Sequence, residues 1–217
     1  MHAVLWDMDG VLVDSEPLWT VAEVELAREL GGQWTEEVKA LVVGTRLDVS
    51  VPTILRFYGA PDGPEEVARA SAFLLDRMVD LYAGDVVLMP GASELLAEVR
   101  AAGIPVALVS SSFRALVDSV LAASVGPFEL TLAGDEVTHA KPHPEPYLTA
   151  AARLGVDPAR CVVVEDSPSG VAAGEAAGAA VVAVPSVPGV LFDPAPRRLV
   201  AASLADVTLA DLRELVG

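Results

Sequence analysis

The chain has 217 residues, of which 53% are hydrophobic and 21% charged, and its 31 acidic and 14 basic side chains give a formal net charge of −17. Because a chain this apolar can bury enough surface to offset the entropy of ordering, disorder is excluded for most of it. The negative charge repels phosphate backbones, and the longest uncharged stretch, residues 176–192, is interrupted by Pro185 and Pro188, so we expect neither a nucleic-acid nor a membrane partner.

The first predicted element is a buried strand over residues 3–6, and a long helical interval follows it. From about residue 14 to residue 84 the apolar residues recur at helical spacing, and most of these runs end before a glycine. The expected helices are residues 18–30, 35–43, 49–58 and 64–82. We interpret this interval as a helical cap inserted after the first strand, and the alternative is a continuation of the core.

The rest of the chain alternates short apolar segments with segments of helix length. The expected strands are residues 105–109, 130–133, 161–164 and 180–184, and the expected helices are residues 94–102, 144–154 and 168–177. Near-continuous apolar strands between helices imply a parallel sheet that is covered on both faces. The predicted fold class is therefore α/β, a doubly wound parallel sheet from residues 1–13 and 88–217 with an inserted all-helical cap at residues 14–87.

Polar side chains stand at the carboxyl ends of four predicted strands. They are Asp7 and Asp9 after the first strand, Ser110, Ser111 and Ser112 after the second, Lys141 beyond the third, and Glu165 and Asp166 after the fourth. Ligands of open parallel sheets bind beyond these ends, near the point where the strand order reverses. Each group alone has an ordinary explanation as a turn, a helix cap or a solvated side chain, but the four groups together predict one site.

The composition of this site points to phosphoryl chemistry. Carboxylates crowded at adjacent strand ends repel one another unless a cation or a proton relieves them. Hard oxygen ligands select Mg²⁺, which keeps waters and substrate phosphate in its coordination shell. Lys141 and a serine hydroxyl can then hold the remaining phosphoryl oxygens. We therefore expect Mg²⁺ as the cofactor.

Four segments carry a family pattern: residues 7–19 (DMDGVLVDSEPLW), 109–112 (VSSS), 141–147 (KPHPEPY) and 164–170 (VEDSPSG). In their order and spacing they resemble the haloacid dehalogenase superfamily of phosphohydrolases, in the branch with a small helical cap. The first segment is the most specific, and the resemblance covers nearly the whole chain. It implies a Rossmann-like core domain.

The resemblance also implies a role for each matched catalytic residue. Asp7 would be the nucleophile that forms an aspartyl phosphate. Asp9 would protonate the leaving oxygen and later deprotonate the attacking water. Ser110, with the backbone of Ser111, would bind the phosphoryl group, and Lys141 would hold the nucleophile and the phosphate together.

The same resemblance implies the metal ligands. Asp166 would bind Mg²⁺ together with Asp7 and the backbone carbonyl of Asp9. Glu165 would be either an additional ligand or a residue that orients the site, and the sequence leaves both roles open.

Within the branch, the segments DSEPLW and KPHP look most like phosphatases that act on hexose, 2-deoxyhexose or hexitol phosphates. The implied function is a Mg²⁺-dependent phosphatase for small phosphate monoesters, with a small phosphorylated metabolite as its partner. The alternative is a phosphotransferase of the β-phosphoglucomutase type. Mutases of that type carry a cap histidine where this chain has Trp19, which favours the phosphatase.

Two further classes of protein fit the sequence less well. Phosphonoacetaldehyde hydrolase would need a Schiff-base lysine in the cap, and we interpret Lys39, the only candidate, as a solvated helix lysine. A phosphoacceptor switch that resembles receiver domains would place similar residues at strand ends, but it would leave the helical insertion without a role.

The remaining candidates are isolated residues. Arg46, in the segment 44–46, either reaches the substrate or is an exposed arginine at a helix start. His139 and His143 flank Lys141 without a partner at ligand spacing, so we interpret both as structural, and we assign Trp6 to core packing.

The sequence also predicts a compartment and an oligomeric state. Cys161 is the only cysteine and cannot form an internal disulfide. The first residues lack the basic start of a secretory signal. We therefore expect a cytoplasmic protein, and we expect it to be a monomer.

Overall fold

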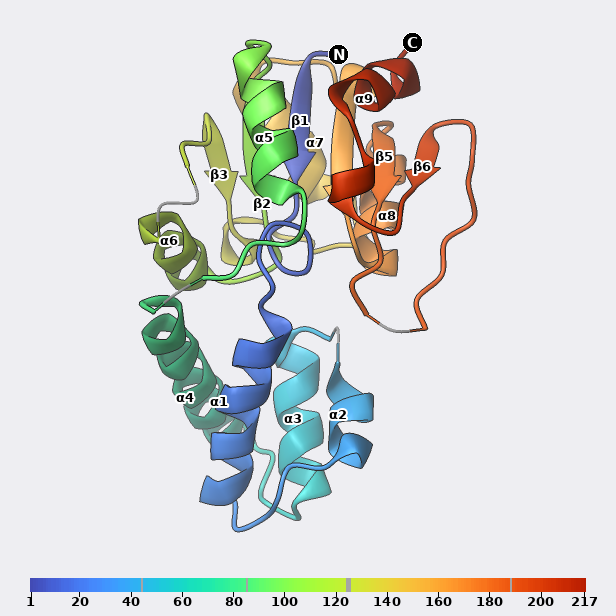
Figure 1. Cartoon of the computed structure of the whole chain (residues 1–217). Coiled ribbons are helices and arrows are strands. Elements are labelled where there is room, and N and C mark those ends of the chain that lie inside the picture. Colours follow the sequence, from blue (N-terminus) through green and yellow to red (C-terminus); the bar gives the residue numbers. More distant parts are fainter. Residues whose placement is uncertain (44, 85, 124–125, 188) are drawn as a thin grey trace. The chain divides into compact units, whose positions relative to one another are not determined.

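The structure is a computed structural model that describes residues 1–43, 45–84, 86–123, 126–187 and 189–217. The chain divides into two compact units, Met1–Asp14 with Val86–Gly217, and Ser15–Asp85. The first unit, here the core domain, is an α/β structure, and the second, here the cap, is helical (Figure 1). The boundaries expected from the sequence lay between residues 13 and 14 and between residues 87 and 88.

The core domain is built on a parallel sheet. Its strands are β1 (Ala3–Trp6), β2 (Val106–Val109), β3 (Leu130–Leu132), β4 (Cys161–Glu165), β5 (Ala180–Ala183) and β6 (Arg198–Val200). They lie in the order β3-β2-β1-β4-β5-β6, and every neighbouring pair is parallel. This is the strand order of a doubly wound fold, so the predicted fold class is confirmed. The strand order reverses between β1 and β4.

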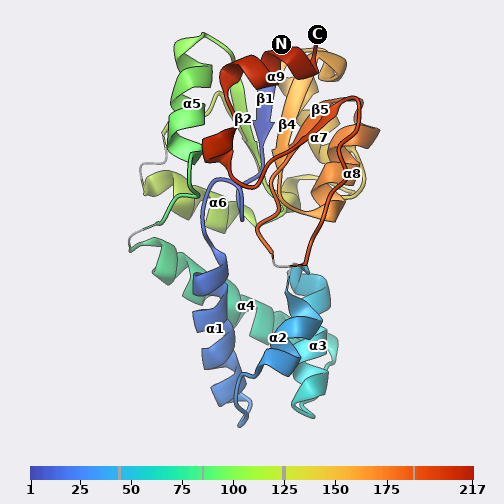
Figure 2. The ribbon, with the colours of Figure 1, turned by 45° about the vertical axis from the view of Figure 1, so that its right-hand side comes forward.

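Helices cover both faces of this sheet. In the core domain they are α5 (Ala92–Ala101), α6 (Arg114–Ala122), α7 (Glu145–Leu154), α8 (Pro168–Ala176) and α9 (Leu209–Leu215). Helices α7 and α8 pack on one face, and α5 lies on the other face beside α9 (Figure 2). Because both faces are covered, β1, β2, β4 and β5 are buried along their whole length, which explains their unbroken apolar sequences.

The apolar core follows the alternation of the strands. Ala3 and Leu5 of β1 join the cluster on the α7 and α8 face, together with Val163 of β4. The alternate residue Trp6 is equally buried, so its assignment to core packing is confirmed. Packing on both sides of β1 fixes the position at which this strand ends.

The sequence did not predict β6 or α9. The strand β6 is a half-buried edge strand of three residues that begins at Arg198, whose side chain pairs with Glu175 of α8. It therefore lacks the apolar run that identified the central strands. The helix α9 has a single buried residue, Leu212, so it lacks the buried apolar face that a helical pattern reports.

The cap contains α1 (Glu16–Glu29), α2 (Glu36–Val42), α3 (Leu47–Phe57) and α4 (Pro64–Tyr82). Helix α1 packs against α4, and α3 packs against α2 and α4. The buried residues Leu74, Met78 and Tyr82 recur every four positions along α4, as expected for an amphipathic helix. Arg77 of α4 donates two hydrogen bonds, of 2.7 and 3.1 Å, to the carboxylate of Glu25 on α1. Among the described residues, no helix has both the length and the apolar character needed to cross a bilayer.

Candidate active site

The loop after β1 begins the site. Asp7 directly follows the strand, and its N–H still donates to the carbonyl of Val164 in β4 (3.0 Å). Gly10 has a φ of +76°, which favours glycine. A Cβ at Gly10 would lie 2.2 Å from Oδ2 of Asp166, so only glycine lets this loop turn so closely against the end of β4.

Lys141 is buried at the centre of the site and joins three strand ends. Its Nζ donates to Oδ1 of Asp7 at 2.5 Å, to Oε1 of Glu165 at 2.7 Å and to the carbonyl of Val109 at 2.9 Å. Burial alone would lower the pKa of Lys141, but the carboxylates of Asp7 and Glu165 raise it well above its usual value. Lys141 is therefore a fixed ammonium group.

Glu165 is completely buried, and both of its oxygens accept hydrogen bonds. Oε1 accepts from Lys141 and from the hydroxyl of Tyr147 on α7, both at 2.7 Å. Oε2 accepts from the backbone N–H groups of Asp166 (3.1 Å) and Ser167 (3.2 Å) and from the Ser167 hydroxyl (3.1 Å). A Cβ at Gly170, in the first turn of α8, would lie only 1.8 Å from Cδ of Glu165, so the helix fits tightly over this carboxylate.

The serines after β2 hold the carboxylate of Asp9. Oδ2 of Asp9 accepts a hydrogen bond from the Ser112 hydroxyl at 2.8 Å and a longer one from the buried Ser110 hydroxyl at 3.5 Å. The N–H of Ser112 donates to Oγ of Ser110 at 2.9 Å. On the other side of this turn, a Cβ at Gly134 would lie 2.1 Å from the carbonyl oxygen of Ser111. The loop is therefore tightly enclosed.

The site holds more negative than positive charge. Burial raises the pKa of Asp7 well above its usual value, the ammonium of Lys141 opposes this, and the neighbouring carboxylates reinforce it. Burial, reinforced by the charge of Glu165, raises the pKa of Asp166 to about 7, against the opposing hydrogen bond from Ser186. Carboxylates in this state are stabilised when a cation binds among them.

The donor set fits Mg²⁺. One carboxylate oxygen from each of Asp7, Glu165 and Asp166 lies within 4.8 Å of the others. Because five protein donors already fill the lone pairs of both oxygens of Glu165, Asp7 and Asp166 are the carboxylates best placed to bind a divalent cation. Oxygen ligands in small number suit Mg²⁺, which retains several waters.

All the residues proposed for the site lie at the carboxyl edge of the sheet. They are Asp7, Asp9, Ser110, Ser111, Lys141 and Asp166. Hydrogen bonds join Asp7 to Lys141 and Asp9 to Ser110, whereas Asp166 lies against the Gly10 loop.

The sequence analysis missed three partners. Tyr147 belonged to the family pattern without a role, the contact of Ser112 with Asp9 was not foreseen, and Ser186, which donates to Oδ2 of Asp166, was not considered. Ser186 follows β5. A search for polar side chains after the carboxyl end of every predicted strand, and not only of four, would have found it.

The candidate residues of the cap have local partners. Lys39 lies on α2 with a partly exposed side chain, and its Nζ lies 3.1 Å from Oε1 of Glu16 and donates to the Thr20 hydroxyl at 3.4 Å, contacts that a solvated helix lysine can make. Arg46 precedes α3 and pairs with Asp48 at 3.2 Å, as an exposed arginine at a helix start would. Gly44, the first residue of the segment 44–46, lies outside the described residues.

Comparison with known proteins yields one family and a consistent set of relatives. The family model of haloacid dehalogenase-like hydrolases matches residues 1–178. Hexitol phosphatase B of Escherichia coli K12 is 35% identical over 220 residues, which cover 99% of this chain and 94% of that protein. The crystal structure of CbbY from Rhodobacter sphaeroides in complex with phosphate is 31% identical, with a TM-score of 0.85 and coverage of 98% and 99%. A putative β-phosphoglucomutase from Thermotoga maritima is 28% identical, with a TM-score of 0.75 and coverage of 95% and 96%.

Proposed function

Because the chain belongs to the haloacid dehalogenase-like hydrolase family, we propose that it hydrolyses phosphate monoesters of sugars or sugar alcohols with Mg²⁺, through an aspartyl phosphate on Asp7. The observation that carries this proposal is the 2.5 Å contact between Asp7 and the buried ammonium of Lys141, at the strand ends where the sheet order reverses. A carboxylate held in this way is a nucleophile in a fixed orientation.

In the first half of the reaction, an oxygen of Asp7 attacks phosphorus and the bond from phosphorus to the substrate oxygen breaks. Burial raises the pKa of Asp7, and the positive charge of Lys141 opposes this effect and so favours the ionised, nucleophilic form. Asp9 donates a proton to the leaving oxygen, which departs as an alcohol.

In the second half, a water oxygen attacks the phosphorus of the aspartyl phosphate. Asp9, now a carboxylate, takes a proton from this water, and the bond between phosphorus and Asp7 breaks. Inorganic phosphate leaves, Asp7 is again a carboxylate and Asp9 is again protonated. The Ser112 hydroxyl, which donates to Oδ2 of Asp9 at 2.8 Å, would keep Asp9 in one orientation through both transfers.

The remaining groups of the site would bind the phosphoryl group of the substrate and neutralise its charge. Mg²⁺ held by Asp7 and Asp166 would offset the charge of the phosphoryl oxygens. Ser110 and the backbone of Ser111 would bind the phosphoryl group. Glu165 fixes the position of Lys141 through the 2.7 Å contact, so we propose a positioning role for it rather than a ligand role.

The relatives guide the choice of substrate. One relative is named a hexitol phosphatase, and hexitol and hexose phosphates are therefore the first compounds to test. We propose a small metabolite rather than a nucleic acid or a membrane lipid because the net charge is −17. The buried single cysteine, Cys161, agrees with a reducing compartment, so we propose a cytoplasmic, monomeric enzyme.

The nucleophile is tested with a conservative substitution. Asp7→Asn keeps the size of the side chain but removes the charge that attacks phosphorus, so phosphate release from a panel of sugar phosphates should fall by several orders of magnitude. Circular dichroism should show an intact fold. A folded Asp7→Asn protein with activity near that of the wild type would disprove the aspartyl phosphate route.

The mutase remains the second candidate because a putative β-phosphoglucomutase is among the similar structures. A mutase must exclude water until a sugar bisphosphate has reoriented. The protein is therefore given β-glucose 1-phosphate, Mg²⁺ and a trace of glucose 1,6-bisphosphate, and glucose 6-phosphate and free phosphate are followed together. We expect free phosphate to appear faster, and the reverse order would favour the mutase.

A further inference from the structure

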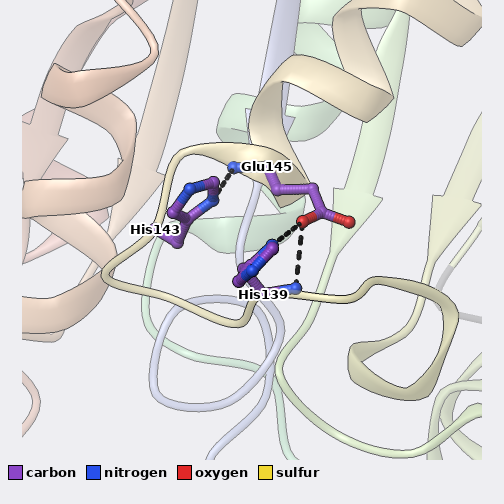
Figure 3. Close-up of side chains that lie close together, drawn as sticks. All are labelled: His139, His143 and Glu145. Atoms are coloured by element: carbon purple, nitrogen blue, oxygen red, sulfur yellow. Dashed lines mark hydrogen bonds and ion pairs between the residues drawn. The ribbon is translucent and has the colours of Figure 1, made fainter.

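A second group of potential metal ligands lies on the segment that carries Lys141 into the active site. The structure brings Glu145, the first residue of α7, against His139 and His143 (Figure 3). Nδ1 of His139 lies 2.7 Å from Oε2 of Glu145, and the centres of the two imidazole rings are 4.6 Å apart. One ligand atom from each of the three side chains lies within 4.8 Å of the others. The sequence analysis had found no partner for either histidine.

The backbone already holds this group in place. The carboxylate of Glu145 accepts the N–H of Thr138 at 2.7 Å and that of His139 at 2.9 Å, which ties the start of the segment to the start of α7. The N–H of Glu145 donates to Nδ1 of His143 at 3.2 Å. His143 stands between Pro142 and Pro144, two residues with fixed φ that also restrict the backbone of His143. A bound ion would therefore meet a backbone that the contacts of Thr138 and His139 order beforehand. At His143 the ion would replace the hydrogen bond from Glu145, because a neutral imidazole has one free lone pair.

The donor set differs in kind from that of the acidic site. Two imidazole nitrogens and one carboxylate oxygen suit Zn²⁺ and its neighbours late in the first transition row, whereas Mg²⁺ prefers oxygen alone. The histidines are separated by three residues, a spacing that zinc sites use, so the two are partners at ligand spacing, contrary to our interpretation of the sequence.

The geometry requires only side-chain motion. Tetrahedral coordination places zinc ligand atoms about 3.3 Å apart. The 2.7 Å contact between His139 and Glu145 would open by about 0.6 Å, and the widest pair would close by at most about 1.5 Å. The side chain of His139 is 61% exposed, so its ring can rotate to do this.

We propose that His139, His143 and Glu145 bind one Zn²⁺ or a similar late transition-metal ion, with a water at the fourth position. The negative charge of the protein raises the local concentration of cations. Because His139 and His143 stand two residues before and two residues after Lys141, the bound ion joins the chain on both sides of this lysine. The ion therefore fastens the segment that supplies the active-site ammonium.

The test uses full-length protein without a histidine tag, in the background of His2→Ala. The chain has three histidines, and His2 could bind a metal together with the N-terminal amine. The acidic site offers only oxygen ligands, so imidazole ligation in the His2→Ala protein reports the proposed site alone. Excess Mg²⁺ is present throughout, and Zn²⁺ is the ion used for counting.

The matched variants are His139→Ala, His143→Asn and Glu145→Gln. In His143→Asn the amide oxygen can still accept the N–H of Glu145, so the segment keeps its hydrogen bond while it loses the imidazole. Equilibrium dialysis should find one Zn²⁺ fewer in each histidine variant than in the His2→Ala parent at the same free Zn²⁺ concentration. Glu145→Gln should weaken this binding about tenfold or more.

A spectroscopic measurement identifies the ligands. With one equivalent of Cu²⁺ in place of Zn²⁺, electron paramagnetic resonance of the parent should show coupling to two imidazole nitrogens, and His143→Asn should show one. Melting temperatures without added transition metal show whether each variant is folded. Equal Zn²⁺ counts in the parent and in folded His143→Asn, or a Cu²⁺ spectrum without nitrogen coupling, would overturn the proposal.

Discussion

Replacement of Glu165 by glutamine separates the two roles that its position allows, metal ligand and positioning residue. The substitution keeps the size of the side chain but exchanges one acceptor oxygen for an NH₂ donor. In the wild type, Oε1 faces Lys141 and Tyr147, and Oε2 faces the backbone N–H groups of Asp166 and Ser167. The backbone donors cannot turn away, so the new NH₂ group should lie beside Lys141.

The expected cost follows from the broken ion pair. Removal of one partner of a buried ion pair costs about 3–5 kcal/mol. Lys141 keeps its contacts with Asp7 at 2.5 Å and with the Val109 carbonyl at 2.9 Å, so we expect the lower value, about 3 kcal/mol. For a chain of this length each 1 kcal/mol lowers Tm by about 2–4 °C, which gives a decrease of about 6–12 °C. Since the catalytic ammonium loses one of three anchors, kcat should fall about ten- to hundredfold.

The assay measures Tm and the dependence of kcat on Mg²⁺ concentration. If Glu165 positions Lys141, kcat falls at saturating Mg²⁺ while the half-maximal Mg²⁺ concentration changes by less than about twofold. Asp166→Asn is the matched comparison and should raise the half-maximal concentration about tenfold or more, because it removes a proposed ligand. Tyr147→Phe is the milder control, since it removes one donor to Oε1. Recovery of wild-type kcat in Glu165→Gln at high Mg²⁺ would refute the positioning role.

Three further predictions concern the acid, the metal and the cap. Asp9→Asn should reduce kcat strongly for sugar phosphates and least for aryl phosphates, which need little protonation of the leaving oxygen, and equal losses on both would argue against Asp9 as the acid. Excess chelator should abolish phosphate release, Mg²⁺ should restore it, and Ca²⁺ should inhibit because it takes more ligands in a looser shell. Burial and the charge of Glu16 raise the pKa of Glu23 to about 7, and the charge of Lys39 opposes this shift. The folded protein is therefore stabilised by protonation of Glu23, and this stabilisation is complete below pH 4.5 and is lost as the pH rises through about 7. Glu23→Gln should therefore stabilise the protein by about 1–2 kcal/mol at pH 8, after allowance for partial exposure, and leave Tm unchanged at pH 4.5.

The central strands were predictable from the sequence because burial on both faces leaves only apolar residues in them. β1 was predicted with its observed ends, and the ends of β2, β4 and β5 differ by one residue. The edge strand β6 was not predictable in this way. It contacts the sheet on one side only, so the sequence there tolerates Arg198 and half-buried side chains.

The location of the site was predictable for a related reason, but its contacts were not. In a parallel sheet the residue after each strand faces one edge, so the position of Asp7 or Asp166 follows from the end of its strand. The atoms that meet there come from distant parts of the chain, and Lys141 and Asp7 are 134 residues apart. A local pattern therefore indicates the edge of the sheet but not the hydrogen bonds between the side chains that gather there.

Because the sequence does not give these hydrogen bonds, it left two roles open for Glu165, metal ligand and positioning residue. The hydrogen bonds of the structure favour the positioning role. Whether a carboxylate can bind a metal depends on how many of its roughly four lone-pair positions are already engaged. Here the donors come from α7 through Tyr147, from the loop through Lys141 and from the turn into α8 through Ser167. The two motif acids at the end of β4 look equivalent in the sequence, yet five donors surround Glu165, whereas Asp166 lies at the Gly10 loop beside Ser186. The fold thus gives the two adjacent acids different roles: Glu165 fixes the ammonium of Lys141, and Asp166 is placed to bind Mg²⁺.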